Sequence, residues 1–337
     1  MSDALILAES DLAGLAGAIL GGTGRVAAPV LADGRRTLAW LETAEEFLLP
    51  EVNTVNSIKE FFFPAGEVIF GYRQSGGSTE ILPAGAAAIK PFVVFGVRPC
   101  DAASLEIMDK VFNWDTTDES WKARRDAATV VVIGCRNADR YCFCTSVGLA
   151  PDARQGADVI LLPTAGGNYI AEAVTDKGRA LVSDYRGFFK PQAAAALQSA
   201  SVPGRTDAGK ARKWLEGNFE AGLWERASSR CLGCGICTYY CPTCHCFDIQ
   251  DEADAGAGVR FKVWDSCSFG LFTKHASGHN PRPDRRSRWR QRIMHKFCCY
   301  PERFGVVSCT GCGRCGRLCP VDLGVEETLG IITGESA

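Results

Sequence analysis

Two short, continuous apolar runs stand out in the first half of the chain, at residues 92–97 and 129–133. Runs of this length without alternating polar positions predict buried strands, most often parallel ones that are covered on both faces. Between the two runs, residues 101–112 carry apolar side chains at helical spacing, which predicts a helix with one buried face. A strand, a helix and a second strand in this order are typical of an α/β fold.

The flanking segments extend the α/β pattern. The sequence predicts helices at residues 10–20 and within 178–197, and strands at residues 25–30, 159–162 and 169–174. Ser10 is placed to cap the first helix and Gly21-Gly22 to end it. The glycines of residues 22–27 superficially resemble a dinucleotide-binding turn, but they follow a helix and precede a strand, which is the reverse of that motif. We interpret them as the C-terminal cap of the helix.

Composition narrows the classes of protein to which the chain can belong. Of its 337 residues, 46 % are hydrophobic and 23 % are charged, which excludes disorder, and no apolar run approaches the roughly 20 residues of a membrane helix. The acidic N-terminus lacks the basic region of a secretory signal, and a net charge of −2 argues against general binding to nucleic acid. Seventeen cysteines, an odd number with C-x2-C spacings, indicate metal or cluster ligation in a reducing cytoplasm rather than disulfides.

Eight of the cysteines lie in two near-identical runs, CLGCGICTYYCP at residues 231–242 and CTGCGRCGRLCP at residues 309–320. Both match C-x2-C-x2-C-x3-C-P, the bacterial ferredoxin pattern, in which the fourth cysteine binds the other cluster of a two-cluster protein. The pattern predicts two [4Fe–4S] clusters, the first bound by Cys231, Cys234, Cys237 and Cys319, and the second by Cys309, Cys312, Cys315 and Cys241. A pair of zinc knuckles is the alternative, but zinc sites use two close pairs separated by a spacer.

Other residues of the two runs are expected to adjust the clusters. Four glycines are expected to have positive φ and to bring backbone N–H groups to the sulfurs, namely Gly233, Gly235, Gly311 and Gly313. Arg314 and Arg317 flank the second run, and their positive charge is expected to raise the reduction potential of that cluster above that of the first.

Composition and the cysteine runs together divide the chain. Residues 199–213 are interpreted as a linker between an α/β domain, residues 1–198, and a second domain, residues 214–337. A helix is expected around residues 214–226. The second domain is predicted to be an α+β ferredoxin-like dicluster domain with a long insertion, residues 243–308, between its two cysteine runs.

Four cysteines of the first domain indicate a third site. Cys100 and Cys135 each follow one of the predicted parallel strands, so both are expected at the carboxyl edge of the sheet, where α/β folds place their ligands. Cys142 and Cys144 lie within loop reach of that edge. Asp101 is expected to cap the helix that begins beside Cys100, where a helix N-terminus favours a thiolate. The set predicts a third [4Fe–4S] cluster, with zinc or unreactive buried thiols as the alternatives.

The insertion contains the remaining five cysteines, Cys244, Cys246, Cys267, Cys298 and Cys299. The first three could form a further site with either of the last two, but no spacing assigns them a role. Residues 282–296 carry seven Lys or Arg and one acid, with Trp289, Ile293 and Phe297 at helical spacing across and just beyond them. We interpret this segment as a helix with one buried stripe. Its basic remainder is a solvated face, a docking surface for an acidic redox partner, or a nucleic-acid site.

Motifs for substrate turnover are missing from the sequence. It contains no P-loop, no G-x-S-x-G, no H-E-x-x-H and no convincing flavin or nicotinamide fingerprint. We therefore expect the chain to carry electrons for chemistry that is performed elsewhere, with no catalytic residue of its own.

Several longer motifs resemble one family of dicluster proteins. They are FGVRPCDAASL at residues 95–105, CFCTS at 142–146, CPTCHCFD at 241–248, WDSC at 264–267, HASGHNPR at 275–282 and HKF at 295–297. The chain resembles, from about Ser57 to Asp322, the iron–sulfur β subunits of cytosolic [NiFe] sulfhydrogenases (hydrogenase/sulfur reductases) and the corresponding iron–sulfur subunits of anaerobic sulfite reductases.

The resemblance implies a cytoplasmic electron-transfer subunit without a membrane span. Such a protein would sit beside a reductase subunit, which binds flavin and NAD(P), and relay electrons to or from a catalytic subunit. Family members also carry the first-domain cysteines, which supports a third cluster at Cys100, Cys135, Cys142 and Cys144. The resemblance leaves the catalytic partner open, and Cys298 and Cys299 do not match its pattern. Two alternatives remain: a reductase with its own substrate-binding cluster in the first domain, and structural clusters beside a nucleic-acid-binding segment.

Overall fold

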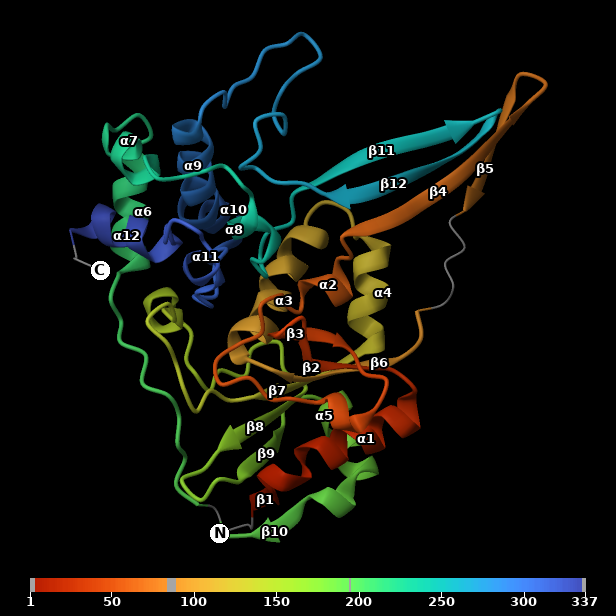
Figure 1. Ribbon diagram of the computed structural model, residues 1–337, viewed down its shortest axis with the longest axis vertical. Helices are drawn as coiled ribbons and strands as arrows, with labels where there is room; N and C mark the ends of the chain where they lie inside the picture. The colour runs from red at the N-terminus through yellow and green to blue at the C-terminus, as the bar shows by residue number, and fades with distance from the viewer. Residues whose placement is uncertain (1–3, 84–88, 194, 335–337) are drawn as a thin grey trace.

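The computed structural model describes residues 4–83, 89–193 and 195–334. Its largest element is an eight-stranded mixed sheet with the strand order β10-β1-β9-β8-β7-β6-β2-β3 (Figure 1). Four central strands are parallel: β2 (Val26–Ala32), β6 (Phe92–Val97), β7 (Ala128–Ile133) and β8 (Val159–Pro163). The outer strands run antiparallel to their neighbours: β1 (Ala4–Leu7), β3 (Arg35–Trp40), β9 (Tyr169–Ala173) and β10 (Lys190–Gln192). The parallel pairing predicted for the two apolar runs is confirmed.

Helices cover both faces of this sheet, which explains why its central strands are apolar throughout. One face packs on α1 (Leu12–Thr23) and α5 (Asp176–Asp184), and the other on α2 (Lys59–Phe62), α3 (Pro99–Phe112) and α4 (Glu119–Ala127). Successive side chains of a strand point to opposite faces. In β6, for example, Val93 and Phe95 join the core beneath α1, whereas Phe92 and Val94 join the core beneath α3.

Two helices differ from their predicted extents. Helix α1 follows a 3-10 turn and begins at Leu12 without a side-chain cap from Ser10. It continues through Gly21 and Gly22 and ends at Gly24, whose φ of 70° and N–H bond to the Leu20 carbonyl form the cap. The predicted helix within residues 178–197 is wrong beyond Asp184, where α5 ends. A 3-10 turn follows, and Pro191, which cannot continue a helix, lies in strand β10 beside β1.

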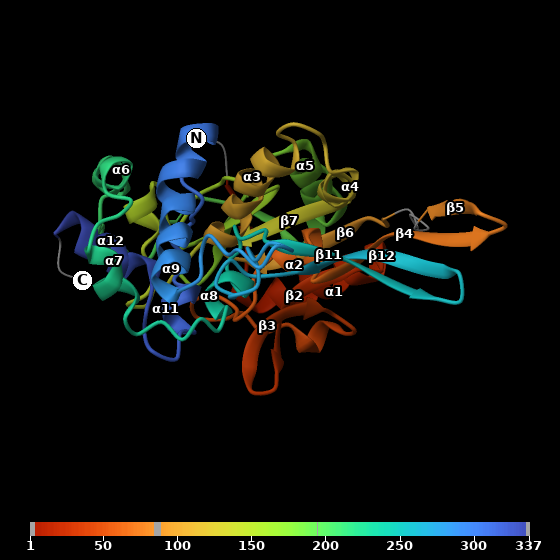
Figure 2. The ribbon, with the colours of Figure 1, turned by 90° about the horizontal axis from the view of Figure 1, so that it is seen from above.

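A second sheet joins two segments that are far apart in the sequence. Its antiparallel strands, in the order β11-β12-β4-β5, are β4 (Gly66–Ser75), β5 (Ser78–Pro83), β11 (Phe247–Asp254) and β12 (Ala257–Trp264). The two hairpins project together away from the rest of the molecule (Figures 1 and 2). Part of the predicted insertion, residues 243–308, therefore pairs with a hairpin of the predicted first domain instead of forming an independent appendage.

The C-terminal region packs around a third hydrophobic core. Its helices are α6 (Ala208–Gly217), α7 (Leu223–Ser228), α8 (Ile236–Tyr239), α9 (Arg285–Met294), α10 (Tyr300–Phe304), α11 (Arg314–Arg317) and α12 (Val325–Thr333), with a π-helical turn η5 (His295–Cys299) after α9. The helix expected at residues 214–226 is divided between α6 and α7. Helix α6 begins inside the predicted linker, because the Asp207 side chain accepts hydrogen bonds from the N–H groups of Gly209 and Lys210. No helix in the described part of the chain is long and apolar enough to cross a membrane.

The close packing of α5 makes a prediction about stability. A Cβ on Gly178 would lie 1.9 Å from the Asp158 carbonyl oxygen, whereas a Cβ on Gly21 in α1 would meet no atom within 4 Å. We expect Gly178→Ala to lower the free energy of unfolding by about 1–3 kcal/mol, because the strand or helix must shift. The matched Gly21→Ala should raise it by about 0.5–1 kcal/mol through helix propensity. Denaturant unfolding of both variants measures these two changes. A change of the same sign in both free energies of unfolding would contradict the close packing at Gly178.

Candidate iron–sulfur sites

Both cysteine runs fold as a tight loop followed by a single helical turn, α8 in the first run and α11 in the second. The predicted positive φ angles are confirmed at all four glycines, at 71° for Gly233, 79° for Gly235, 65° for Gly311 and 76° for Gly313. The Gly311 N–H donates to Cys309 Sγ at 3.4 Å, and the backbone N–H of Gly233 lowers the pKa of Cys231 against the larger, raising effect of burial. Loops whose glycines adopt the left-handed backbone conformation can direct backbone N–H groups at the cysteine sulfurs, as a cluster site needs.

The first predicted ligand set surrounds one cavity. Cys231, Cys234, Cys237 and Cys319 line it together with Gly233 and Gly235. Burial raises the pKa of both Cys231 and Cys237. The structure thus brings together three cysteines of one run and the last cysteine of the other, as cross-ligation requires.

The second predicted set also combines both runs. Thr243, just after Cys241, donates a 2.8 Å hydrogen bond to the Ser308 carbonyl, just before Cys309. Lys296 Nζ donates to the same carbonyl at 2.7 Å and lies 3.4 Å from Cys241 Sγ. Burial raises the pKa of Cys315 to about 12, against the lowering effect of the Arg292 charge, and Cys312 and Cys241 contribute smaller increases. The last cysteine of the first run therefore lies against the second run.

The four first-domain cysteines line a second cavity, at the carboxyl edge of the large sheet. Cys100 lies in the first turn of α3, Cys135 follows β7, and Cys144 begins the 3-10 turn η3 (Cys144–Val147) two residues after Cys142. All four line one cavity, and Cys312 lines it as well. Burial raises the pKa values of Cys135, Cys142 and Cys144 to about 11.

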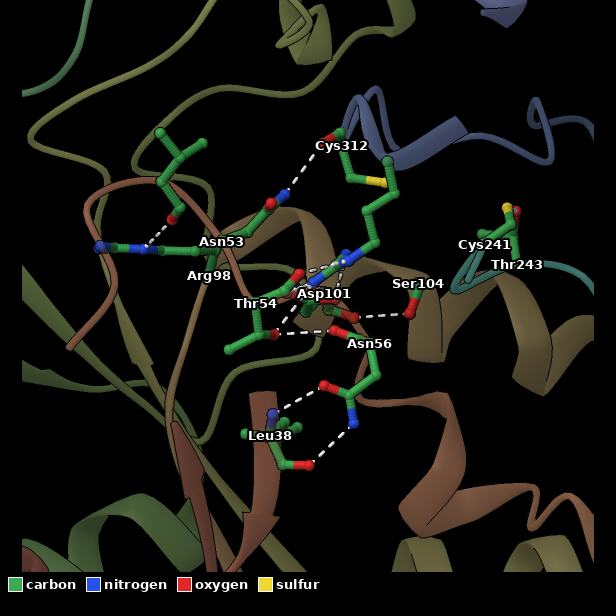
Figure 3. A network of polar contacts seen from close by, with 12 residues as sticks. Leu38, Asn53, Thr54, Asn56, Arg98, Asp101, Ser104, Cys241, Thr243 and Cys312 are labelled. Atoms are coloured by element: carbon green, nitrogen blue, oxygen red, sulfur yellow. Dashed lines mark hydrogen bonds and ion pairs between the residues drawn. The ribbon is translucent and has the colours of Figure 1, made fainter. Parts of the chain in front are cut away.

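Asp101 has a different role from the predicted one. The cap residue of α3 is Arg98, and Asp101 lies inside the first turn, where it is 1 % exposed. Its carboxylate pairs with the buried guanidinium of Arg314, at 2.7 and 3.0 Å. Arg314 also donates to the carbonyl oxygen of Thr54 at 2.9 Å, as shown in the network of Figure 3. This ion pair fastens the second cysteine run to the sheet domain.

The two arginines of the second run therefore do not provide the unpaired charge that we expected. Arg314 is neutralised by Asp101, and Arg317 donates to both carboxylate oxygens of Asp139, at 2.6 and 2.8 Å. Each pair carries little net charge, so the expected increase in the potential of the second cluster loses its basis.

The second run packs directly on the loop that carries Cys142 and Cys144. The Phe143 N–H donates to the Gly311 carbonyl at 2.9 Å, and Asn53 donates to the Cys312 carbonyl at 2.9 Å (Figure 3). A Cβ on Gly311 would lie 2.4 Å from Cys144 Cα. Cys312, a predicted ligand of the second cluster, also lines the sheet-edge cavity.

The basic segment contains site residues that the sequence interpretation missed. The predicted burial of Trp289, Ile293 and Phe297 is confirmed, but Arg292 and Lys296 are also buried, at 2 % and 3 % exposure. Arg292 donates to Cys244 Sγ at 3.3 Å and to the Cys237 carbonyl. The sequence did contain a signal for the burial of these five residues, because their positions follow the i, i+3, i+4, i+7, i+8 pattern of one helix face. Neither charge belongs to a solvated or docking surface.

The chemistry of these donor sets fits iron–sulfur clusters. All seventeen cysteines are free thiols, and burial holds the pKa of most predicted ligands above the ordinary value, so a metal must displace the proton when it binds. Within the described ranges, no three His, Cys, Asp or Glu side chains converge as ligands of one metal ion. Thiolates spaced around a cavity are suited to a cluster of several irons.

The sheet-edge cavity makes a prediction about metal content. We expect the full chain with Cys100→Ser and Cys135→Ser, purified without oxygen, to contain about four irons and four sulfides fewer than the wild-type chain. Cys299→Ser is the matched control, because Cys299 is exposed and lies in the helical turn η5. Iron and acid-labile sulfide analysis provides the measurement. An unchanged iron content in the double variant would contradict a cluster at this edge.

Comparison with known proteins agrees with this geometry. The family described as the 4Fe-4S dicluster domain matches residues 230–323, which include both cysteine runs. The sulfhydrogenase 2 subunit beta of Pyrococcus furiosus is 31 % identical over 313 residues, which cover 88 % of this chain and 89 % of that protein. No solved structure gives a significant match.

Proposed function

Because the chain belongs to the family of sulfhydrogenase beta subunits, we propose that it relays electrons between a reductase subunit, which binds flavin and NAD(P), and a catalytic subunit. It is an iron–sulfur protein with [4Fe–4S] clusters in a dicluster domain. The relative is named as one subunit of a sulfhydrogenase, which supports a role inside a multi-subunit oxidoreductase. We place this relay in the cytoplasm, where thiols stay reduced.

We assign the ligands of the relay to the three cysteine sets as the sequence pairs them. Cys231, Cys234, Cys237 and Cys319 would hold the first cluster, and Cys309, Cys312, Cys315 and Cys241 the second. Cys100, Cys135, Cys142 and Cys144 would hold a third. The clusters supply one-electron transfer when bound, and this chain's own residues keep them close together and away from water. We retain residues 1–198 and 214–337 as the two proposed domains.

One observation carries this proposal: Cys312 belongs to the second cysteine run and also lines the sheet-edge cavity. An electron at the sheet edge therefore has a route into the dicluster domain through directly adjacent sites. The Arg314–Asp101 pair and the Asn53–Cys312 hydrogen bond hold that junction in a fixed geometry. A buried, rigid junction suits transfer between centres because neither centre must move or exchange solvent.

The test separates the relay from the reactions at its two ends. In the native complex, isolated through a tag on this chain, we expect Cys312→Ala to lower hydrogen-dependent reduction of NAD(P)⁺ by about tenfold or more. Reduction of a viologen dye by hydrogen at one end, and by NAD(P)H at the other, should remain near the wild-type rate. Cys299→Ser should leave all three rates unchanged.

Two results would contradict the relay. One is full hydrogen-dependent NAD(P)⁺ reduction by the Cys312→Ala complex after loss of the neighbouring cluster signal. The other is reduction of sulfite or polysulfide by this chain alone with a viologen donor, which would favour the alternative of a reductase with its own substrate-binding cluster.

A further inference from the structure

Three cysteines outside the predicted ligand sets are brought together by the second sheet. Cys246 immediately precedes β11, and Cys267 follows β12 by three residues. Strands β11 and β12 pair from Phe247 opposite Trp264, so their ends place the two cysteines side by side. The Asp265 N–H donates to the Cys246 carbonyl at 3.0 Å.

Cys244 completes this group and connects it to the ferredoxin-type sets. The Cys244 N–H donates to the Cys241 carbonyl at 3.4 Å. Ser268, next to Cys267 in the chain, has its Oγ 3.9 Å from Cys237 Sγ. We call Cys244, Cys246 and Cys267 the hairpin-base cysteines. The group therefore lies beside Cys241 of the second predicted cluster and Cys237 of the first.

Cys298 and Cys299 do not contribute to the hairpin-base group. Cys298 packs in the hydrophobic core of the C-terminal helices, and Cys299 is exposed. The sequence left open a further site that would include Cys298 or Cys299. The structure groups only the three hairpin-base cysteines.

Buried positive charge lies beside the hairpin-base cysteines. Arg292 Nη1 donates to Cys244 Sγ at 3.3 Å, and Lys296 Nζ reaches Cys241 Sγ at 3.4 Å. Lys59 Nζ is also buried, 2.9 Å from the Tyr239 carbonyl and 3.8 Å from the centre of the Trp264 ring. In the described part of the chain, none of these three cations has a carboxylate within ion-pair distance.

An uncompensated buried cation costs several kcal/mol, so such groups are found with an anionic partner. Neutral thiols do not provide that partner, and two neighbouring clusters share these cations with the hairpin-base group. The Arg292 Nε–H has no acceptor, although it is fully buried. The arrangement is complementary to additional negative charge centred on Cys244, Cys246 and Cys267.

We propose that the hairpin-base cysteines Cys244, Cys246 and Cys267 bind an additional iron–sulfur cluster through three thiolates. This inference rests on the proposed function, because it adds a centre to the same electron relay. The site lies between the two ferredoxin-type clusters, with Arg292, Lys296 and Lys59 as its buried counter-charge.

The test compares cluster counts in the full chain, purified without oxygen. We expect Cys246→Ser with Cys267→Ser to remove one cluster, seen as a loss of about three to four irons by iron and sulfide analysis and as one missing cluster mass by native mass spectrometry. The EPR signals of the ferredoxin-type clusters should persist. Cys299→Ser should retain the wild-type count. A double variant with the wild-type cluster count would overturn the proposal.

A second variant decides the question if the double variant does not fold. The chain with Cys100→Ser and Cys135→Ser lacks the sheet-edge site, so native mass spectrometry of that variant counts the remaining clusters directly. Three clusters support the hairpin-base site, and two contradict it. If this variant retains two clusters while the wild-type complex couples hydrogen oxidation to NAD(P)⁺ reduction, only this inference is removed. A wild-type chain without clusters would remove the proposed function as well.

Discussion

Charge balance in the interior is the constraint on which the rest of this structure depends. Four buried cations, Lys59, Arg98, Arg292 and Lys296, have no carboxylate partner in the described part of the chain. Asp101 is the one carboxylate among the buried residues described, and it is already paired with Arg314. Burying this much positive charge is unfavourable unless anions are buried with it.

Each unpartnered cation lies beside a predicted cysteine site. Arg98 opposes the rise in pKa that burial causes at Cys135, and it donates to backbone carbonyls such as that of Gly134 at 3.1 Å. Arg292 and Lys296 contact Cys244 and Cys241. Burial lowers the pKa of Lys59 to about 8, and the charges of nearby cysteines oppose this shift. We propose that thiolates, and the anionic clusters that they would bind, supply the counter-charge that stabilises this interior.

The same reasoning explains how the two halves of the molecule hold together. The second cysteine run packs on the sheet-edge loop through close backbone contacts that only glycine permits at position 311. The buried Arg314–Asp101 pair adds a polar link at the same junction, and breaking such a pair costs about 3–5 kcal/mol. A junction that is both tight and polar fixes the spacing of the centres on either side, which is what electron transfer between them needs.

Much of this arrangement could be predicted from local sequence signals. The apolar runs indicated two parallel strands because both faces are covered, and the ferredoxin spacing identified the glycines with positive φ. The pairing of β4 with β12 could not be foreseen, since it joins segments nearly two hundred residues apart and local patterns do not identify a strand's distant partner. The sequence left the grouping of Cys244, Cys246 and Cys267 open for the same reason, because the hairpin register is what brings Cys246 to Cys267.

The contacts made by the basic side chains were the other feature that local sequence patterns did not predict. Arg314 and Arg317 look like free positive charges in the sequence, but their carboxylates come from α3 and from the loop after β7. Arg292 and Lys296 look like part of a solvated basic face, although their register places them on the buried stripe. In both cases the deciding contact is tertiary, and only the helical spacing of Arg292 and Lys296 gave an early signal.

The most direct test of charge balance in the interior is a redox titration of the cluster-loaded chain with Lys296→Met, followed by EPR. Removing a buried positive charge disfavours the reduced, more negative state of a neighbouring cluster, so we expect a lower midpoint potential for the cluster bound by Cys241. Lys274→Met, at an exposed position, should leave every potential unchanged. An unchanged potential in Lys296→Met would contradict the claim that buried cations balance the charge of the clusters.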